Sequence, residues 1–107
     1  MLPDNVKKEI DNISEQLIKK YKPEKIILFG SAAAGNFKSD SDLDFLIVKK
    51  NTPLIGRDRA REIRKLIHKN IAADFLVYRP EELEKRQSLG DPFIKSILQF
   101  GKVLYGA

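Results

Sequence analysis

The stretch LFGSAAAGNFKSDSDLDFLIV, residues 28–48, decides the predicted fold and contains the candidate site. An apolar run ends in a Gly-Ser turn, and a second apolar run opens with Asp42 and Asp44. Strands disfavour Asp, and like charges side by side repel each other. Because side chains alternate along a strand, both carboxylates share a face with Leu46 and Val48. Either these carboxylates simply lie in solvent, or a function offsets the cost of placing them there.

Outward from this stretch, apolar spacing predicts helices and strands along the whole chain. Their order, α-β-β-α-β-α-α, is typical of an α+β or α/β domain. The predicted elements are a helix from its N-cap Asp4 to Tyr21, strands over 25–29, 42–49 and 72–78, a helix over 57–70 with apolar positions Ala60, Ile63, Leu66 and Ile67, and short helices starting at Pro80 and Asp91.

The composition is typical of one soluble domain over residues 1–107, with 42% hydrophobic residues to form a core. There is no cysteine, which excludes disulfides and cysteine-bound zinc and fits a cytosolic protein. The N-terminus, MLPDNVKKEI, lacks the apolar region of a signal peptide. The longest apolar run, Phe45–Val48, is too short to cross a bilayer. We therefore expect a cytoplasmic location without membrane association.

The charge balance favours partners that carry phosphate, since 20 basic and 15 acidic residues leave a net charge of +5. The basic residues are spread along most of the chain, so a solvated surface explains the charge equally well. Arg57, Arg61, Arg64 and His68 share one face of the helix predicted over 57–70. A solvated face is the preferred interpretation, and contact with phosphate or an acidic partner is the alternative.

A third acid, Asp74, opens the strand predicted over 72–78. If the two strands are neighbours in similar register, Asp42, Asp44 and Asp74 converge at one edge of a sheet. Three close carboxylates repel by several kcal/mol, and divalent cations convert that repulsion into binding. Hard oxygen ligands suit Mg²⁺ or Mn²⁺, and two metals can clamp an in-line phosphoryl displacement. The alternative is a solvated acidic edge, because an Asp-x-Asp pattern is short and common.

The Gly30-Ser31 turn precedes these acids. Glycine lets a phosphate approach the backbone closely, and free N–H groups with the Ser31 hydroxyl would donate to it. The stretch lacks the Lys-Ser/Thr ending of a Walker P-loop and any Gly-x-Gly-x-x-Gly run. It is therefore either an ordinary turn or a triphosphate-binding turn of another kind.

Taken together, Gly30-Ser31, ten intervening residues, Asp42-Leu43-Asp44 and the later Asp74 resemble the nucleotidyltransferase superfamily, to which DNA polymerase beta belongs. Within it, the chain looks like the minimal nucleotidyltransferase (MNT) domains, and the resemblance covers nearly all of it. The resemblance implies a small α+β fold in which a central mixed β-sheet of about three main strands is flanked by helices.

The resemblance also implies roles for single residues. Gly30 and Ser31 would bind the phosphates of a nucleoside triphosphate. Asp42 and Asp44 would hold two Mg²⁺ ions, which Mn²⁺ can replace. Asp74 would complete the catalytic metal site and help to deprotonate the attacking hydroxyl. A nucleoside monophosphate, AMP when the substrate is ATP, would then move to that hydroxyl and pyrophosphate would leave.

The resemblance further implies a partner protein. Many small family members are antitoxins that transfer AMP to a tyrosine of a HEPN-domain toxin, and we expect such a toxin to supply the acceptor here. Direct nucleic-acid binding is not expected. Relatives commonly carry one or two arginines where this chain has Ala32 and Ala34. Their absence would weaken phosphate binding or a structural ion pair, unless Lys38 or an arginine of the second long helix compensates. The alternatives are an inactive antitoxin that neutralises its partner by binding, and a small basic nucleic-acid-binding module. An exposed part of the last helix would serve for partner contact or for a homo-oligomer.

Overall fold

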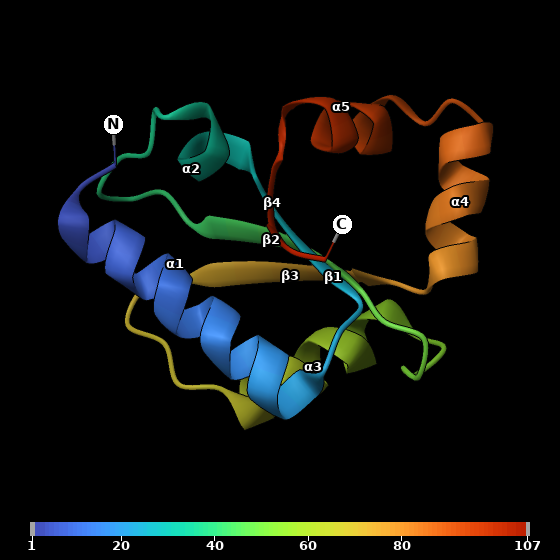
Figure 1. Cartoon of the computed structure of the whole chain (residues 1–107), viewed down its shortest axis with the longest axis horizontal. Coiled ribbons are helices and arrows are strands. Elements are labelled where there is room, and N and C mark those ends of the chain that lie inside the picture. Colours follow the sequence, from blue (N-terminus) through green and yellow to red (C-terminus); the bar gives the residue numbers. More distant parts are fainter. Residues whose placement is uncertain (1, 107) are drawn as a thin grey trace.

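The computed structural model describes residues 2–106 and contains a four-stranded mixed sheet with helices on both faces (Figure 1). The strand order is β3-β2-β1-β4. β2 pairs antiparallel with β1 and parallel with β3, while β4 pairs antiparallel with β1. The predicted α+β class and mixed sheet are confirmed, and a short fourth strand adds to the three expected. The strands are β1 (Lys25–Phe29), β2 (Leu43–Val48), β3 (Ala73–Tyr78) and β4 (Lys102–Tyr105).

The helices form two groups on opposite sides of the sheet (Figure 1). α1 and α3 lie on one side, whereas α4 and α5 lie on the other, and α2 is a single turn at the end of β1. Within residues 2–106, no helix combines the length and the apolar character that crossing a membrane requires. The bounds are α1 (Asp4–Gln16), continued by the π-helical turn η1 (Leu17–Tyr21), then α2 (Gly30–Ala34), α3 (Gly56–Leu66), α4 (Pro80–Ser88) and α5 (Pro92–Phe100).

The alternation of side chains along the strands divides the core into two parts. On the α1 and α3 side, Phe45 of β2 stacks on Phe75 of β3 with ring centroids 5.6 Å apart. On the α5 side, Leu46 and its neighbours in β1 pack against Ile94 and Ile97. Residue 44 therefore points to the α5 side, because Phe45 points to the other.

Two predicted helix ends were wrong. α1 has Pro3 rather than Asp4 as its N-cap, since the Pro3 carbonyl accepts hydrogen bonds from the N–H groups of Val6 and Lys7, both at 3.1 Å. The second long helix ends at Leu66 instead of Asn70, and Leu66 is 38% exposed rather than part of the core. Beyond it the backbone is extended.

A buried acid, Glu9 of α1, holds the segment that leads into β3. Its carboxylate accepts hydrogen bonds from the backbone N–H groups of Asn70 and Ile71, the latter at 3.1 Å, and from the side chain of Asn12. Burial alone would raise the pKa of Glu9, but these hydrogen bonds lower it below its ordinary value. The start of β3, and with it Asp74, is thereby tied to α1.

Candidate active site

Strand register places Asp44 and Asp74 side by side. They are direct partners in the parallel pair of β2 and β3, so both side chains point to the α5 side of the sheet. On the other side of β2, Asp44 is the register partner of Phe29, the last residue of β1. The turn at Gly30 follows immediately. One row across the sheet therefore contains Phe29, Asp44 and Asp74, and the Gly-Ser turn begins directly after its first member.

Asp42 lies just outside this row. It was expected within the second strand, but β2 begins at Leu43, so Asp42 is in the preceding loop and is exposed. Asp44 is half-buried, and Asp74 is exposed. Burial, the charge of Asp74 and then the charge of Asp42 raise the pKa of Asp44 above its ordinary value. The three carboxylates thus share one electrostatic environment.

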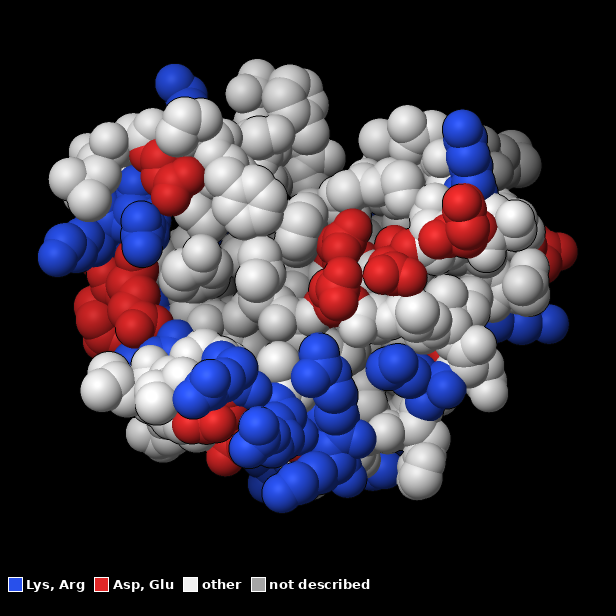
Figure 2. Space-filling model, turned by 180° about the vertical axis from the view of Figure 1, so that it is seen from behind, with Lys and Arg blue, Asp and Glu red and all other residues white. Residues whose placement is uncertain are grey.

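One face of the molecule has separated charges. Figure 2 shows acidic side chains gathered near the middle of that face and a larger group of Lys and Arg side chains below them. The α3 residues Arg57, Arg61 and Arg64 are exposed, as a solvated face requires. Within the described part of the chain, one of these three arginines forms an ion pair: Arg61 lies 3.9 Å from Asp58.

Gly30 allows the Asp44 carboxylate to lie against the turn. Its φ is +74°, a left-handed conformation that favours glycine. A Cβ at this position would overlap Asp44 Oδ2 and lie 3.2 Å from Asp44 Cγ. The next residue, Ser31, is half-buried at the start of α2. Of the alanines that replace arginines, Ala32 is in the core and Ala34 is exposed.

A Gly30→Ala substitution should destabilise the protein more than Gly35→Ala. Gly35 also has a left-handed φ, +82°, but no atom lies within 4 Å of a Cβ there. Gly35→Ala should therefore cost about 1 kcal/mol from backbone strain alone. Gly30→Ala should cost about 1–3 kcal/mol more, because the Asp44 side chain must move. Urea unfolding of both variants measures the difference, and equal losses would contradict the close approach.

The chemistry of this donor set fits a divalent cation. Carboxylate oxygens are the ligands of Mg²⁺, which usually takes one or two of them and completes its shell with water and substrate phosphates. Within residues 2–106, no group of three or more His, Asp or Glu side chains is placed so that it could hold a metal ion. Mg²⁺ does not require three carboxylates, because water and substrate phosphates complete its shell. Asp44 and Asp74, register partners on β2 and β3, are two carboxylates of the kind that it takes.

A buried ion pair, not singled out in the sequence, anchors α4 to the sheet. Arg59 of α3 is 4% exposed and contacts Glu82 of α4 with both arms, at 2.7 and 3.1 Å. Its Nη1 also donates to the Val77 carbonyl at 2.9 Å, and Nη2 donates to the Leu54 carbonyl at 3.1 Å. The sequence contained a sign that Arg59 is buried, because Arg59 precedes Ile63 by one helical turn and so falls on the apolar face of the helix.

The same pair predicts a pH dependence of stability. The hydrogen bond from Arg59, aided by the Arg79 N–H, lowers the pKa of Glu82 from 4.5 to about 2. A depressed pKa in the folded state stabilises the protein above pH 4.5, and this contribution is lost as the pH falls toward 2. Urea unfolding at several pH values should show a constant difference in the free energy of unfolding between wild type and Glu82→Gln near neutrality. This difference should become smaller below pH 4.5. A difference that stays constant down to pH 2 would contradict the assignment.

Three comparisons with known proteins agree with this geometry. A model of the nucleotidyltransferase domain family matches residues 10–105. A Methanocaldococcus jannaschii protein named "putative protein adenylyltransferase" is 29% identical over 109 residues, which cover 92% of this chain and 73% of that protein. The crystal structure of a "putative nucleotidyltransferase" from Sulfolobus solfataricus superposes with a TM-score of 0.53 at 22% identity, covering 79% of this chain and 82% of that one. The last similarity shows a shared fold.

Proposed function

The chain belongs to the nucleotidyltransferase domain family, and we propose that it transfers AMP from ATP to a protein hydroxyl in a reaction that depends on a divalent metal. The observation that supports this most directly is the row of Phe29, Asp44 and Asp74 across β1, β2 and β3, which places both carboxylates next to the Gly30 turn. It puts a turn that phosphate can approach beside two carboxylates. The name of the M. jannaschii relative points to the same chemistry.

Each residue of the site has a proposed role. Gly30 and Ser31 bind the phosphates, and Asp42 and Asp44 hold Mg²⁺ together with Asp74. The acceptor oxygen attacks the α-phosphorus and forms the new P–O bond, while the bond from that phosphorus to the β-phosphate breaks and pyrophosphate leaves. Asp74, the exposed carboxylate of the row, accepts the hydroxyl proton. Bound Mg²⁺ would neutralise phosphate charge and lower the pKa of the hydroxyl.

We further propose that the acceptor is a tyrosine of a HEPN-domain toxin and that this chain is its antitoxin. The support is the resemblance to the MNT domains. The other role considered, neutralisation by binding alone, predicts a tight complex with no nucleotide requirement. Ala32 and Ala34 stand where relatives commonly carry arginines, which would contact phosphate. The absence of these arginines is the reason for considering the binding-only role.

A combined binding and transfer experiment tests the proposal. A thermal-shift titration with ATP and Mn²⁺ should raise the melting temperature, and α-labelled ATP with Mg²⁺ should label the HEPN protein on tyrosine. Absence of both effects would contradict nucleotidyl transfer. A tight complex with the toxin, without a nucleotide-dependent shift and without label, would identify the chain as a binding-only antitoxin. Label on RNA in preference to protein would contradict the acceptor class.

A further inference from the structure

We propose that the outer edge of β3 binds the acceptor as an added β-strand, with the hydroxyl-bearing residue opposite Asp74. The occupant is an extended, acidic polypeptide segment that has a Glu or Asp two residues from the hydroxyl. This inference rests on the proposed function and specifies its substrate. It is argued from the register of the sheet and from the groove beside β3.

The first step is that β3 has a free edge. It is the terminal strand in the order β3-β2-β1-β4. On its inner edge, the Ala72 carbonyl accepts from Leu43 N at 2.9 Å and the Tyr78 carbonyl accepts from Lys49 N at 3.0 Å. In a parallel pair, backbone groups of alternate residues face the partner strand. Even-numbered residues therefore bond to β2, and the odd-numbered residues of β3 present their N–H and C=O groups outward.

A side chain contact confirms the direction of that edge. The carbonyl of Val77 accepts a hydrogen bond from Arg59 Nη1 at 2.9 Å, which comes from outside the sheet. Arg59 therefore occupies the edge at its C-terminal end. The part that an added strand would pair with is the N-terminal half, where Ala73 and Phe75 flank Asp74.

The second step is that a residue opposite Asp74 would point into the site. Residues directly opposite each other on neighbouring strands direct their side chains to the same face, about 4.5–5.5 Å apart at Cβ. Asp44 already stands in this relation to Asp74 from β2. An added strand would repeat it on the outer side, so the row would contain Phe29, Asp44, Asp74 and the acceptor. A tyrosine, serine or threonine there would carry its hydroxyl to Asp74, on the side away from the phosphate turn.

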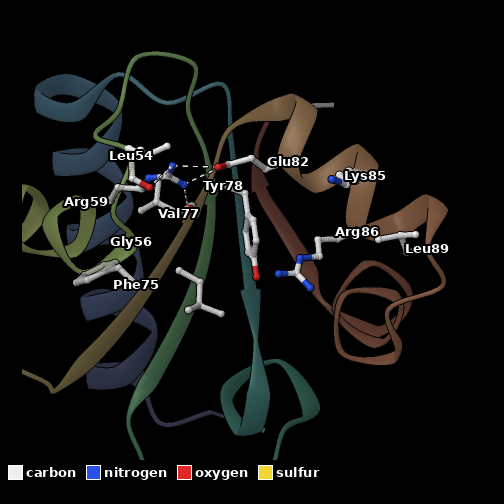
Figure 3. Close-up of a pocket in the computed structure, with 11 residues that line it drawn as sticks. Leu54, Gly56, Arg59, Phe75, Val77, Tyr78, Glu82, Lys85, Arg86 and Leu89 are labelled. Carbon is white, nitrogen blue, oxygen red and sulfur yellow. Dashed lines mark hydrogen bonds and ion pairs between the residues drawn. The ribbon is translucent and has the colours of Figure 1, made fainter.

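The third step is a groove of about 640 Å³ that continues from this point along β3 (Figure 3). Four consecutive residues, Phe75 to Tyr78, line it. Because successive side chains point to opposite faces, four in a row can share one groove only if the strand backbone is part of its wall. The opposite walls come from α4 and from the Leu54–Gly56 segment.

The charges of the groove select an acidic segment. Arg59 and Glu82 neutralise each other at its base, whereas Lys85 and Arg86 of α4 are exposed at its rim, where Arg86 also lies 3.8 Å from the Asp91 carboxylate. In Figure 3 the Arg86 side chain and the Tyr78 side chain point toward one another. The residue of an added strand that lies two positions from the hydroxyl, opposite Leu76, would face this rim. A carboxylate there would meet Lys85 and would compete with Asp91 for Arg86.

In the transfer at this position, the acceptor oxygen bonds to the α-phosphorus of ATP and the bond from that phosphorus to the pyrophosphate oxygen breaks. The hydroxyl proton passes to Asp74. The products are an adenylylated peptide and pyrophosphate. No oxidant or reductant is needed.

The test starts with binding in the absence of nucleotide. The probe is a synthetic peptide of alternating Thr and Val that contains Tyr and Glu two positions apart. Amide hydrogen exchange, followed by NMR, should slow about tenfold at Ala73 or Phe75 when the peptide is added. The amides of Asp74 and Leu76 already face β2 and should not change. Absence of protection at Ala73 and Phe75 with saturating peptide would overturn the inference.

A charge reversal tests the rim. Lys85→Glu should weaken binding of the acidic peptide about tenfold. The same variant should bind a peptide with Lys in place of Glu about as well as wild type binds the acidic peptide. Lys20→Glu is the matched control, since Lys20 is also an exposed lysine in the last turn of a helical segment, η1, and lies outside the groove. Equal effects of the two substitutions would overturn the charge selection, as would preferential binding of a single-stranded oligonucleotide at this edge.

A peptide with the tyrosine moved by one position separates this inference from the proposed function. That residue would point to the opposite face, so transfer of AMP should be lost while binding persists. Equal labelling of both peptides would overturn the placement opposite Asp74.

If the toxin is labelled while Phe75 stays unprotected, the inference fails and the proposed function stands. If the edge is protected but ATP does not bind, strand binding is supported and the proposed function fails.

Discussion

An Asp44→Asn variant should transfer AMP at least about a thousandfold more slowly than wild type. Asn keeps the size and one oxygen of the side chain but removes the negative charge. Asp44 is the central member of the row and lies between the Gly30 turn and Asp74. Asp44 is the half-buried carboxylate of the site and has register partners on both sides, so the loss should exceed that of any other single change in the site.

The same variant should be at least as stable as wild type. The pKa of Asp44 is raised by burial and by the charges of Asp74 and Asp42. A raised carboxylate pKa means that the ionised form is disfavoured in the folded state, so stability falls as the pH rises through the ordinary value of 3.8. Removing the charge should therefore stabilise the fold at neutral pH. Opposite effects on activity and stability are typical of a site that is built for function.

Initial rates of label transfer and thermal unfolding, measured on the same preparations, test both halves of this prediction. Asp40→Asn is the matched control, because it removes one negative charge from an exposed position in the loop before β2. It should leave the transfer rate within about twofold of wild type. Full activity of Asp44→Asn would contradict the proposed chemistry, and a large loss of stability would contradict the electrostatic argument.

Arg59→Ala should cause a large loss of stability, about 3 kcal/mol. The substitution leaves the Glu82 carboxylate without its partner and removes donors from the carbonyls of Val77 and Leu54. Removing one member of a buried pair usually costs about 3–5 kcal/mol. The lower end applies here, because the Glu82 side chain is 34% exposed and water can solvate part of its charge. The guanidinium stem also fills space between α3 and β3.

Urea unfolding with a matched arginine measures this cost. Arg61 lies on the same helix, is 64% exposed, and contacts Asp58 only at 3.9 Å. Arg61→Ala should therefore change the free energy of unfolding by less than about 0.5 kcal/mol. Should Arg59→Ala fail to fold, Glu82→Gln tests the same contact with a smaller expected loss. Losses below about 1 kcal/mol for both Arg59→Ala and Glu82→Gln would contradict the assigned role of the pair.

Most of the elements were predictable from local patterns. The strand Lys25–Phe29 and the helix that follows Asp91-Pro92 both form where expected. In the last case Asp91 accepts hydrogen bonds from the N–H groups of Phe93 and Ile94 at 3.0 and 3.3 Å. These features depend on neighbours within a few residues, which is the range that sequence patterns report.

The errors involve contacts between distant residues. The helix that was expected to reach Asn70 ends at Leu66, and the segment after it is held by Gln16 of α1, which exchanges hydrogen bonds with the backbone of His68 at 2.8 and 2.7 Å. The Arg59–Glu82 pair joins residues 23 positions apart. Periodicity contains no information on such partners.

The amino-acid sequence by itself determined which strand face carries Asp44 and Asp74, because alternation is a local property of an extended backbone. It also determined the glycine that the turn requires, since few residues tolerate a φ of +74°. Only the tertiary structure decided that β2 and β3 are parallel neighbours in a register that pairs Asp44 with Asp74. It also placed β3 at the edge of the sheet and left Asp42 in the loop before β2. Strand pairing is a balance of long-range packing and loop closure, and both depend on the whole chain at once.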